Sequence, residues 1–279
     1  MRSRDWSLVF LTVLSQAGIG MVLCLTGLVY SSEGGAVTVG GGSRVEMLLL
    51  LALFLIAIAT AASFFHLGNP ANAPKALRNL TGSWLSREIL AIGVFTGALV
   101  GALVSARAGG EGGVFGSLLL LASASGVLLL LAMIRVYLVP TIPPWNNAYT
   151  PVSFTTTTLC LGLMGFLLLM EIETVGKNYL LAALSVILVV ELLSGLLNHN
   201  RLKRMSPGID GPVFDQGAYH SLFLARMTIL LIACVAILLF LLQGISAAEE
   251  NITWMYLVGG LVVIQEFAGR LLFYASYFR

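Results

Sequence analysis

Charged residues are scarce in this 279-residue sequence. Asp, Glu, Lys and Arg make up only 10% of it, hydrophobic residues make up 58%, and the mean hydropathy is +0.95. Soluble domains carry about 25% charged residues, so this composition excludes a soluble domain with a hydrated surface. The net charge of +2 gives no strongly basic surface of the kind that binds nucleic acid. We therefore predict a membrane protein without a nucleic-acid partner.

Cysteine is rare as well. The three cysteines are Cys24, Cys160 and Cys234, and each lies within an apolar run. No CxxC pair occurs, so the chain has neither a cluster-binding motif nor a disulfide framework. We expect the three thiols to contribute only to core packing.

Only three histidines are present, at His66, His199 and His220. A b-type haem in a helix bundle needs two histidines that project inward from facing helices at matching depth. His199 and His220 are predicted to lie in one polar loop, and no HxxxH or HExxH pair is available for zinc. We therefore expect no haem, iron–sulfur cluster or metal ion in this chain. A phosphate-binding GxxxxGK[ST] loop and a recognisable catalytic triad are also missing.

The sequence does contain a series of apolar runs, each long enough to span a hydrocarbon core of roughly 30 Å. Gly, Pro, Asn or charged residues separate the runs. The first run is not followed by a small-residue cleavage site, so we expect it to remain as a helix. The predicted fold is an all-α polytopic membrane protein, a bundle of eight transmembrane helices that forms one integral-membrane domain over 1–279. The predicted helices are about 8–30, 45–66, 88–106, 115–138, 151–170, 178–197, 221–243 and 254–276.

An even number of helices places both termini on one side of the membrane, which we call the terminal face. Loops and termini predicted on this face carry nine basic residues, whereas the opposite face carries three. Basic loops are usually cytoplasmic, which predicts a cytoplasmic terminal face. The nine are Arg2, Arg4, Lys75, Arg78, Arg87, Arg201, Lys203, Arg204 and Arg279, and the three are Arg44, Arg107 and Lys177.

Several ionisable residues fall within predicted helices, where charges are costly and usually paired or functional. Glu266 and Arg270 are four residues apart, which favours an intrahelical ion pair. Arg135 is predicted to pair with a lipid headgroup or with Glu191, or to orient a loop or a bound ligand. All these groups gather toward the terminal face: His66, Glu88, Arg135, Glu191, Arg226, Glu266 and Arg270.

Three loops on the terminal face are long or rich in proline, namely 67–87, 139–150 and 198–220. Proline fixes their turns, and together they are predicted to form an irregular cap. Irregular caps carry function more often than tight turns do.

This arrangement favours proton chemistry beside a lipid-soluble quinol. Quinol oxidation releases two electrons and two protons, so a quinol site needs hydrogen-bond acceptors, a proton exit and apolar walls. His66 can accept a proton near neutral pH, and Glu88 can pass it to water. Ser86 is the candidate N-cap of a helix whose dipole would favour ionised Glu88. The alternative is that these three residues only cap helices.

Three segments resemble the dimethyl sulfoxide reductase membrane anchor subunit family. The first is HLGNPANAPKALRNLTGSWLSREIL, beginning at His66. The second is RVYLVPTIPPWNNAYTPVSF at 135–154, and the third is QEFAGRLLFYASY at 265–277. The similarity covers nearly the whole chain in the same order and includes eight helices.

The resemblance implies an anchor without haem that oxidises menaquinol for an iron–sulfur subunit and a molybdopterin catalytic subunit. It implies a location in the prokaryotic cytoplasmic membrane, with the iron–sulfur subunit docked on 67–87, 139–150 and 198–220. The family's quinol-site histidine and glutamate match His66 and Glu88. Arg135, Tyr137, Glu266 and Arg270 match positions that support the site or the fold, whereas Arg87 and Glu191 depart from the family pattern.

Two alternative functions remain open from the sequence. The same buried charges could serve a transporter or channel, although they crowd one end of the bundle and no helix shows an obvious midplane break. A purely structural anchor is the other alternative. Catalytic partners in this family commonly carry an export signal, which conflicts with the charge-based sidedness. The terminal acceptor and the direction of quinone chemistry are not encoded in this sequence.

Overall fold

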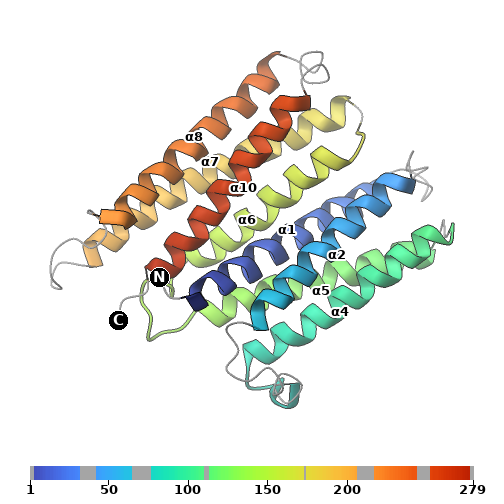
Figure 1. Ribbon diagram of the computed structural model, residues 1–279, viewed down its shortest axis with the longest axis horizontal. Coiled ribbons are helices and arrows are strands. Elements are labelled where there is room, and N and C mark those ends of the chain that lie inside the picture. The colour runs from blue at the N-terminus through green and yellow to red at the C-terminus, as the bar shows by residue number, and fades with distance from the viewer. Residues whose placement is uncertain are drawn as a thin grey trace. The chain divides into compact units, whose positions relative to one another are not determined.

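The computed structural model describes residues 3–31, 42–64, 77–109, 113–172, 174–205, 217–243 and 252–276. Within these ranges the chain forms eight long α-helices and one short 3-10 helix, with no strand (Figure 1). The elements are α1 (Ser3–Ser31), α2 (Gly42–Phe64), η2 (Leu77–Asn79), α4 (Trp84–Arg107), α5 (Gly113–Tyr137), α6 (Tyr149–Leu169), α7 (Thr174–Met205), α8 (Gly217–Gln243) and α10 (Ile252–Ala275).

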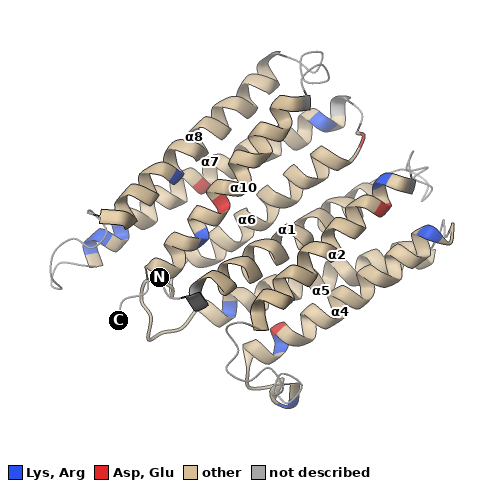
Figure 2. Ribbon diagram, in the orientation of Figure 1, with Lys and Arg blue, Asp and Glu red and all other residues tan. Residues whose placement is uncertain are grey.

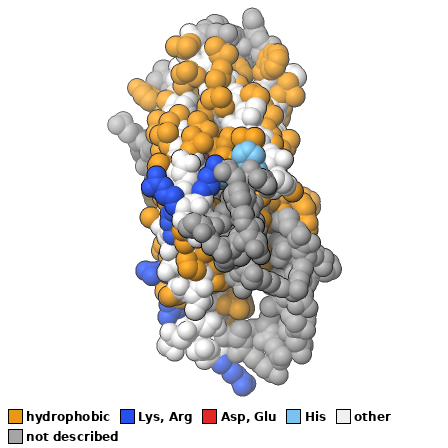
Figure 3. All heavy atoms as spheres, turned by 90° about the vertical axis from the view of Figure 1, so that its left-hand side faces the viewer, with side chains coloured by type: hydrophobic (Ala, Val, Ile, Leu, Met, Phe, Trp, Pro, Cys, Tyr) orange, Lys and Arg blue, Asp and Glu red, His pale blue; other side chains and the backbone are white. Residues whose placement is uncertain are grey.

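All eight long helices are long and apolar enough to cross a membrane. Many large apolar side chains point outward from them, and hydrophobic side chains cover much of the face seen in Figure 3. On α8 the exposed residues include Leu224, Leu231, Val235, Leu238 and Leu242. Apolar surface of this extent is favourable only against lipid or another protein. The chain is a multi-pass, all-α membrane protein, as the sequence predicts.

The apolar runs locate the helices well, but several helices extend beyond their predicted ends, and α7 extends farthest. The sequence predicts that this helix ends at about residue 197, whereas it continues to Met205. The extension includes Asn198, His199 and Arg201, which are polar and therefore invisible to a hydropathy argument. His199 and His220 consequently do not share a loop: the first lies on α7 and the second on α8.

The chain divides into two compact units, which are described separately. The N-terminal unit comprises Arg2–Tyr137 and Leu161–Glu171, and the C-terminal unit comprises Leu138–Cys160 and Ile172–Arg279. In the N-terminal unit α1 packs against α2 and α5, and α4 packs against the same two helices. In the C-terminal unit α8 packs against both α7 and α10 (Figure 1).

Small and hydroxyl-bearing residues allow close approach in the N-terminal unit. Gly162 of α6 faces the backbone of Gly20 on α1 so closely that a Cβ atom at Gly162 would lie 2.8 Å from the Gly20 carbonyl oxygen. The hydroxyl groups of Thr26 and Ser123 are 2.7 Å apart and join α1 to α5. Small residues and interhelical hydrogen bonds are the usual means of association in lipid, where the hydrophobic effect does not act between helices.

The first turn of α4 is capped by Ser83. Its hydroxyl accepts a hydrogen bond from the backbone N–H of Ser86 at 3.3 Å, and its extended backbone is typical of an N-cap. The prediction of Ser86 as the N-cap is therefore wrong, because the helix begins four residues earlier than predicted. Glu88 is the fifth residue of α4, beyond the first turn where the helix dipole acts most strongly.

Ser83→Ala is expected to lower the free energy of unfolding by about 1 kcal/mol, because the Ser86 N–H loses its acceptor. Detergent-dependent unfolding of the full chain, followed by circular dichroism, measures this loss. Ser83→Asp supplies another acceptor and should remain close to wild type. Equal losses in both variants would contradict a capping role.

Candidate functional site

One polar region of the N-terminal unit lies where α4 begins and α5 ends. The Arg135 guanidinium, near the end of α5, lies over the Trp84 ring at 5.6 Å from its centroid. The Arg87 guanidinium lies over the same ring at 4.1 Å. Such cation–π contacts fix the last turn of α5 against the first turn of α4. Among the described residues the contact recorded for Arg135 is with the Trp84 ring, whereas the ion-pair partner of Glu191 is Arg226.

Glu88 lies one helical turn after Trp84, on the same side of α4. Its exposed fraction is only 6%, and no hydrogen-bond or ionic partner for its carboxyl group occurs among the described residues. A buried carboxyl group without a partner is costly and is uncommon unless it has a function. Glu88 is thus the clearest candidate for chemistry in the N-terminal unit.

Arg87 contributes to the fold of the preceding segment. Its Nε donates to the carbonyl of Leu80 and its Nη2 donates to the carbonyl of Thr81, both at 2.8 Å. These bonds, together with the contact to Trp84, hold the chain between η2 and α4. Arg87, which departs from the family pattern, therefore has a structural role beside the site.

Of two further predicted site residues, the structure describes Tyr137 but not His66. Tyr137 is the last residue of α5 and is 8% exposed. His66 lies outside the described residues, two positions after the end of α2 at Phe64. Of the predicted quinol pair, the structure therefore describes only Glu88.

The C-terminal unit contains a buried charged cluster, which we define as Thr157, Glu191, Arg226, Gln265, Glu266 and Arg270. Charged positions on α7, α8 and α10 lie close together partway along these helices in Figure 2. Arg226 of α8 forms an ion pair with Glu191 of α7, and their side chains are only 10% and 2% exposed. Gln265 donates to both carboxyl groups, to Glu266 at 2.9 Å and to Glu191 at 3.4 Å.

Thr157 joins the remaining members of the buried charged cluster. Its hydroxyl lies 2.7 Å from a carboxyl oxygen of Glu266 and accepts from Arg270 at 3.4 Å. Arg270 also lies over the Phe154 ring, 3.7 Å from its centroid. The expected intrahelical ion pair between Glu266 and Arg270 stays a prediction. Both side chains contact one hydroxyl group on α6.

One glycine makes room for the Arg226 guanidinium. A Cβ atom at Gly269 would lie 2.6 Å from the central guanidinium carbon. Gly269 is the glycine of the motif Glu-x-x-Gly-Arg in α10. Its lack of a side chain therefore lets an arginine from α8 reach the carboxyl group on α7.

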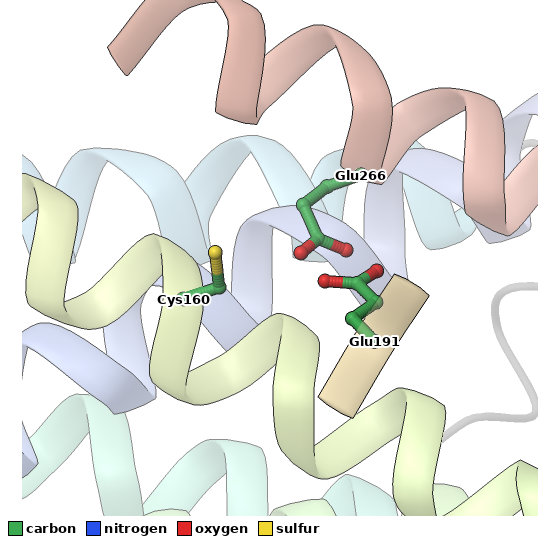
Figure 4. Close-up of side chains that lie close together, drawn as sticks. All are labelled: Cys160, Glu191 and Glu266. Atoms are coloured by element: carbon green, nitrogen blue, oxygen red, sulfur yellow. The ribbon is translucent and has the colours of Figure 1, made fainter. Parts of the chain in front are cut away.

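Within the described ranges, the two carboxyl groups and one thiol form a group of potential metal ligands. In Figure 4 the carboxyl groups of Glu191 and Glu266 face each other, and the Cys160 thiol lies beside them. The ligand atoms of these three residues lie within 4.8 Å of one another. Two carboxylates at this distance repel by about 3 kcal/mol at an effective dielectric constant of about 20. Arg226 offsets this repulsion and would oppose a divalent cation at the same place.

The loop 139–150 is held firmly within the C-terminal unit. The Trp145 indole donates to the carbonyl of Phe273 at 2.9 Å and stacks on that ring with centroids 5.3 Å apart. Arg201 of α7 donates to the carbonyl of Pro143 at 3.2 Å. This predicted docking loop therefore has a defined conformation. The other two, 67–87 and 198–220, include segments outside the described residues, and 198–205 and 217–220 are helical.

The sequence predicted the four charged members of the buried charged cluster, Glu191, Arg226, Glu266 and Arg270, but not their pairing. Glu191 and Arg226 have opposite charge and similar predicted depth in neighbouring helices, and this was the available signal. Cys160 and Thr157 gave no signal, because an isolated thiol or hydroxyl in an apolar helix is normally packing. Glu266 and Arg270 belong to this cluster in the C-terminal unit, whereas Glu88 and Arg135 belong to the N-terminal unit.

Comparison with known proteins identifies the family. The family model described as DMSO reductase anchor subunit (DmsC) matches residues 1–276. The anaerobic dimethyl sulfoxide reductase chain YnfH of Escherichia coli (strain K12) is 29% identical over 97% of this protein and 94% of its own length. The C subunit of the anaerobic dimethyl sulfoxide reductase of Haemophilus influenzae is 28% identical, covering 96% of this protein and 92% of its own length. The corresponding C subunit of Escherichia coli is 27% identical, covering 97% and 94%. With a match over nearly its full length, the protein belongs to the DMSO reductase membrane anchor subunit (DmsC) family.

Proposed function

We propose that this anchor subunit binds and oxidises menaquinol and passes the electrons to an iron–sulfur subunit, which serves a molybdopterin catalytic subunit. The relatives are named as parts of anaerobic dimethyl sulfoxide reductases, which supports a role in anaerobic respiration. The proposed location is the cytoplasmic membrane of a prokaryote. The terminal acceptor is reduced in the catalytic subunit, so the anchor supplies reducing equivalents.

The burial of Glu88 is the observation that carries this proposal. A carboxyl group that is 6% exposed and has no partner among the described residues is suited to bind a ligand proton or hydroxyl group. Trp84 precedes Glu88 by one helical turn on α4, and the Arg135 guanidinium of α5 lies over the Trp84 ring. They offer a cation and an aromatic ring at the edge of an apolar bundle, the combination expected around a quinol head group.

His66 is proposed as the second proton acceptor. It follows α2 by two residues, and α2 packs against α4, which carries Glu88. Each quinol hydroxyl then has one acceptor, and Glu88 passes protons toward water. Tyr137 and Arg135 are proposed to position the head group from the end of α5.

Electron transfer in this proposal needs a short distance between the quinol and a cluster in the partner subunit. We therefore propose that the iron–sulfur subunit docks on the loops 67–87, 139–150 and 198–220. The fixed conformation of 139–150, held by Trp145 and Arg201, suits a docking surface because it costs little ordering on binding.

Glu88→Gln and His66→Ala are each expected to lower quinol-dependent turnover of the assembled complex by about 10²-fold or more, the usual contribution of a positioned acid or base. Turnover is measured with a menaquinol analogue as the donor. The same preparations are then assayed with a reduced viologen, which delivers electrons to the partner subunits directly. Viologen-dependent turnover should remain at the wild-type level.

Glu46→Gln provides a matched control, because it removes a carboxylate from the other end of the N-terminal unit, where Glu46 pairs with Arg107 at 3.1 Å. Quinol-dependent turnover should not change in this variant. Wild-type quinol turnover in both Glu88→Gln and His66→Ala would leave the protein as a structural anchor and would refute the proposed site.

A further inference from the structure

A narrow cavity in the C-terminal unit leads along the helices to the Glu191–Arg226 ion pair. One side of α7 lines it through residues spaced three or four apart, namely Glu191, Ser194, Asn198 and Leu202. This spacing follows a single helix face over roughly 16 Å at 1.5 Å per residue. On α8 the cavity is lined by Tyr219, Phe223 and Arg226, and α6 and α10 complete its walls. The cavity thus joins the buried pair to the end of the unit where α7 ends and α8 begins.

The size of the cavity indicates what it can hold. Its volume is about 60 Å³, far below the range of about 300–1,000 Å³ for pockets that bind organic ligands. A water needs at least about 10–15 Å³ measured in this way, so roughly four waters fit. A quinol head group is therefore excluded from this cavity.

Buried polar atoms in the cavity wall need hydrogen-bond partners, and water molecules can provide them. Arg226 is 8% exposed, and its Nε has no hydrogen-bond partner among the described residues. The buried side-chain oxygen of Asn198 also lacks one within the same ranges. Asn198 and Arg226 both line the cavity, and buried polar groups of this kind are normally satisfied by water. A string of waters from Asn198 to Arg226 would satisfy both.

The contacts of Thr157 leave room for a proton on Glu266. The single hydroxyl hydrogen of Thr157 has two acceptors in reach, the Ser153 carbonyl at 2.8 Å and the Glu266 carboxyl oxygen at 2.7 Å. It can be donated to only one of them. When it is donated to Ser153, the short contact to Glu266 is a hydrogen bond only if Glu266 is protonated and donates to Thr157.

The surrounding charges favour one proton for the two carboxyl groups. Arg226 from α8 forms an ion pair with Glu191 directly, whereas the contacts of Glu266 among the described residues include the neutral side chains of Thr157 and Gln265. Arg270 of α10 is turned toward Thr157 and Phe154, and Cys160 faces the pair from α6. Two neighbouring buried carboxyl groups cannot both ionise readily, so one retains a proton.

We propose that Glu191 and Glu266 together hold one exchangeable proton, and that water in the cavity connects this proton to the end of the C-terminal unit. The pair is a proton-binding site distinct from Glu88, which lies in the N-terminal unit, and it does not depend on quinol oxidation. Glu266 carries the proton while Arg226 pairs with Glu191. Proton transfer between the two carboxyl groups then gives the proton access to the cavity.

Infrared spectroscopy of the full chain in lipid nanodiscs tests the shared proton. A protonated carboxyl group gives a C=O stretching band that shifts in D₂O, and we expect a wild-type band that is lost in Glu266→Gln. Glu191→Gln should lose it too, because Glu266 becomes the counter-ion of Arg226 and ionises. Glu266→Gln and Glu191→Gln test the shared proton independently. The test can therefore be made if either variant folds. Glu171→Gln removes an exposed carboxylate and should keep the band.

The route through the cavity is tested by the rate at which the band shifts after transfer to D₂O. Asn198→Leu fills the cavity with an apolar side chain and should slow the exchange several-fold. Asn200→Leu, at an exposed position on the same helix, should exchange at the wild-type rate. Equal rates in the two variants would refute the route.

Two results would overturn the proton site itself. A carboxyl band that persists in Glu266→Gln and Glu191→Gln would show that this pair holds no proton. Loss of the wild-type band on addition of Zn²⁺, with recovery after chelation, would assign Glu191, Glu266 and Cys160 to a metal instead.

Discussion

Arg226→Met is expected to lower the free energy of unfolding by about 3–5 kcal/mol, one of the largest effects of any single substitution in this protein. Arg226 is the ion-pair partner of Glu191, and their side chains are 10% and 2% exposed. Methionine removes the positive charge and leaves the Glu191 carboxylate buried beside Glu266. Unfolding of the full chain in mixed detergent micelles measures the loss.

Two further variants separate the charge from the volume of the Arg226 side chain. Adding Glu191→Gln to Arg226→Met removes the unpaired carboxylate, so the double variant should recover most of the lost stability. Arg44→Met makes the same substitution in an exposed ion pair with Glu171, whose side chains are 40% and 69% exposed. It should cost less than about 1 kcal/mol. Similar losses in Arg44→Met and Arg226→Met would show that burial of the ion pair does not determine its contribution.

These expected stabilities depend on which charged side chains form ion pairs between helices. The sequence revealed those pairs only in part. The eight spans were predictable because a membrane-crossing helix needs one continuous apolar run, and such a run is a local property of the chain. The polar end of α7 was not predictable in this way. Residues 198–205 are helical without being apolar, because helices can continue beyond the hydrocarbon core into water.

Which buried charged residues contact each other depends on how several helices pack together. The spacing of Glu266 and Arg270 favours an intrahelical pair, yet Arg226 reaches Glu191 because Gly269 leaves room for its guanidinium. Glycine in a transmembrane helix is common, so its sequence position alone does not reveal which arginine it accommodates. The type and approximate depth of the charged residues were predictable, whereas their contacts required the packed structure.

The same reasoning applies to Glu88 and its neighbours. Hydropathy placed Glu88 at the start of its helix, and the structure adds that Ser83 caps this helix and that Arg87 binds the preceding carbonyl groups. Both residues therefore stabilise the start of α4 and leave Glu88 buried without a partner among the described residues. Because Ser83 and Arg87 have these structural roles and Glu88 does not, Glu88 is a stronger functional candidate than the sequence alone indicated.

Gly162→Ala is expected to produce the second large effect, a loss of at least about 1–3 kcal/mol from overpacking between α1 and α6. The added Cβ atom would overlap the backbone carbon atoms of Gly20 and lie 2.8 Å from its carbonyl oxygen. Unlike the atoms of a side chain, backbone atoms cannot rotate away, so the two helices must separate. Because helix association in lipid depends on close packing, this separation also removes dispersion contacts along the interface.

Two alanine variants calibrate this effect within the same unit. At Gly165 the new Cβ atom would meet the Met21 sulfur at 2.8 Å, and this side chain is flexible enough to move, so Gly165→Ala should cost less than Gly162→Ala. At Gly97 no atom lies within 4 Å of the new Cβ atom, and Gly97→Ala should be neutral or slightly stabilising. Unfolding midpoints in one detergent series would rank the three variants. A Gly162→Ala midpoint equal to that of Gly97→Ala would show that α1 and α6 do not make this backbone contact, because the clash exists only if the two glycines face each other.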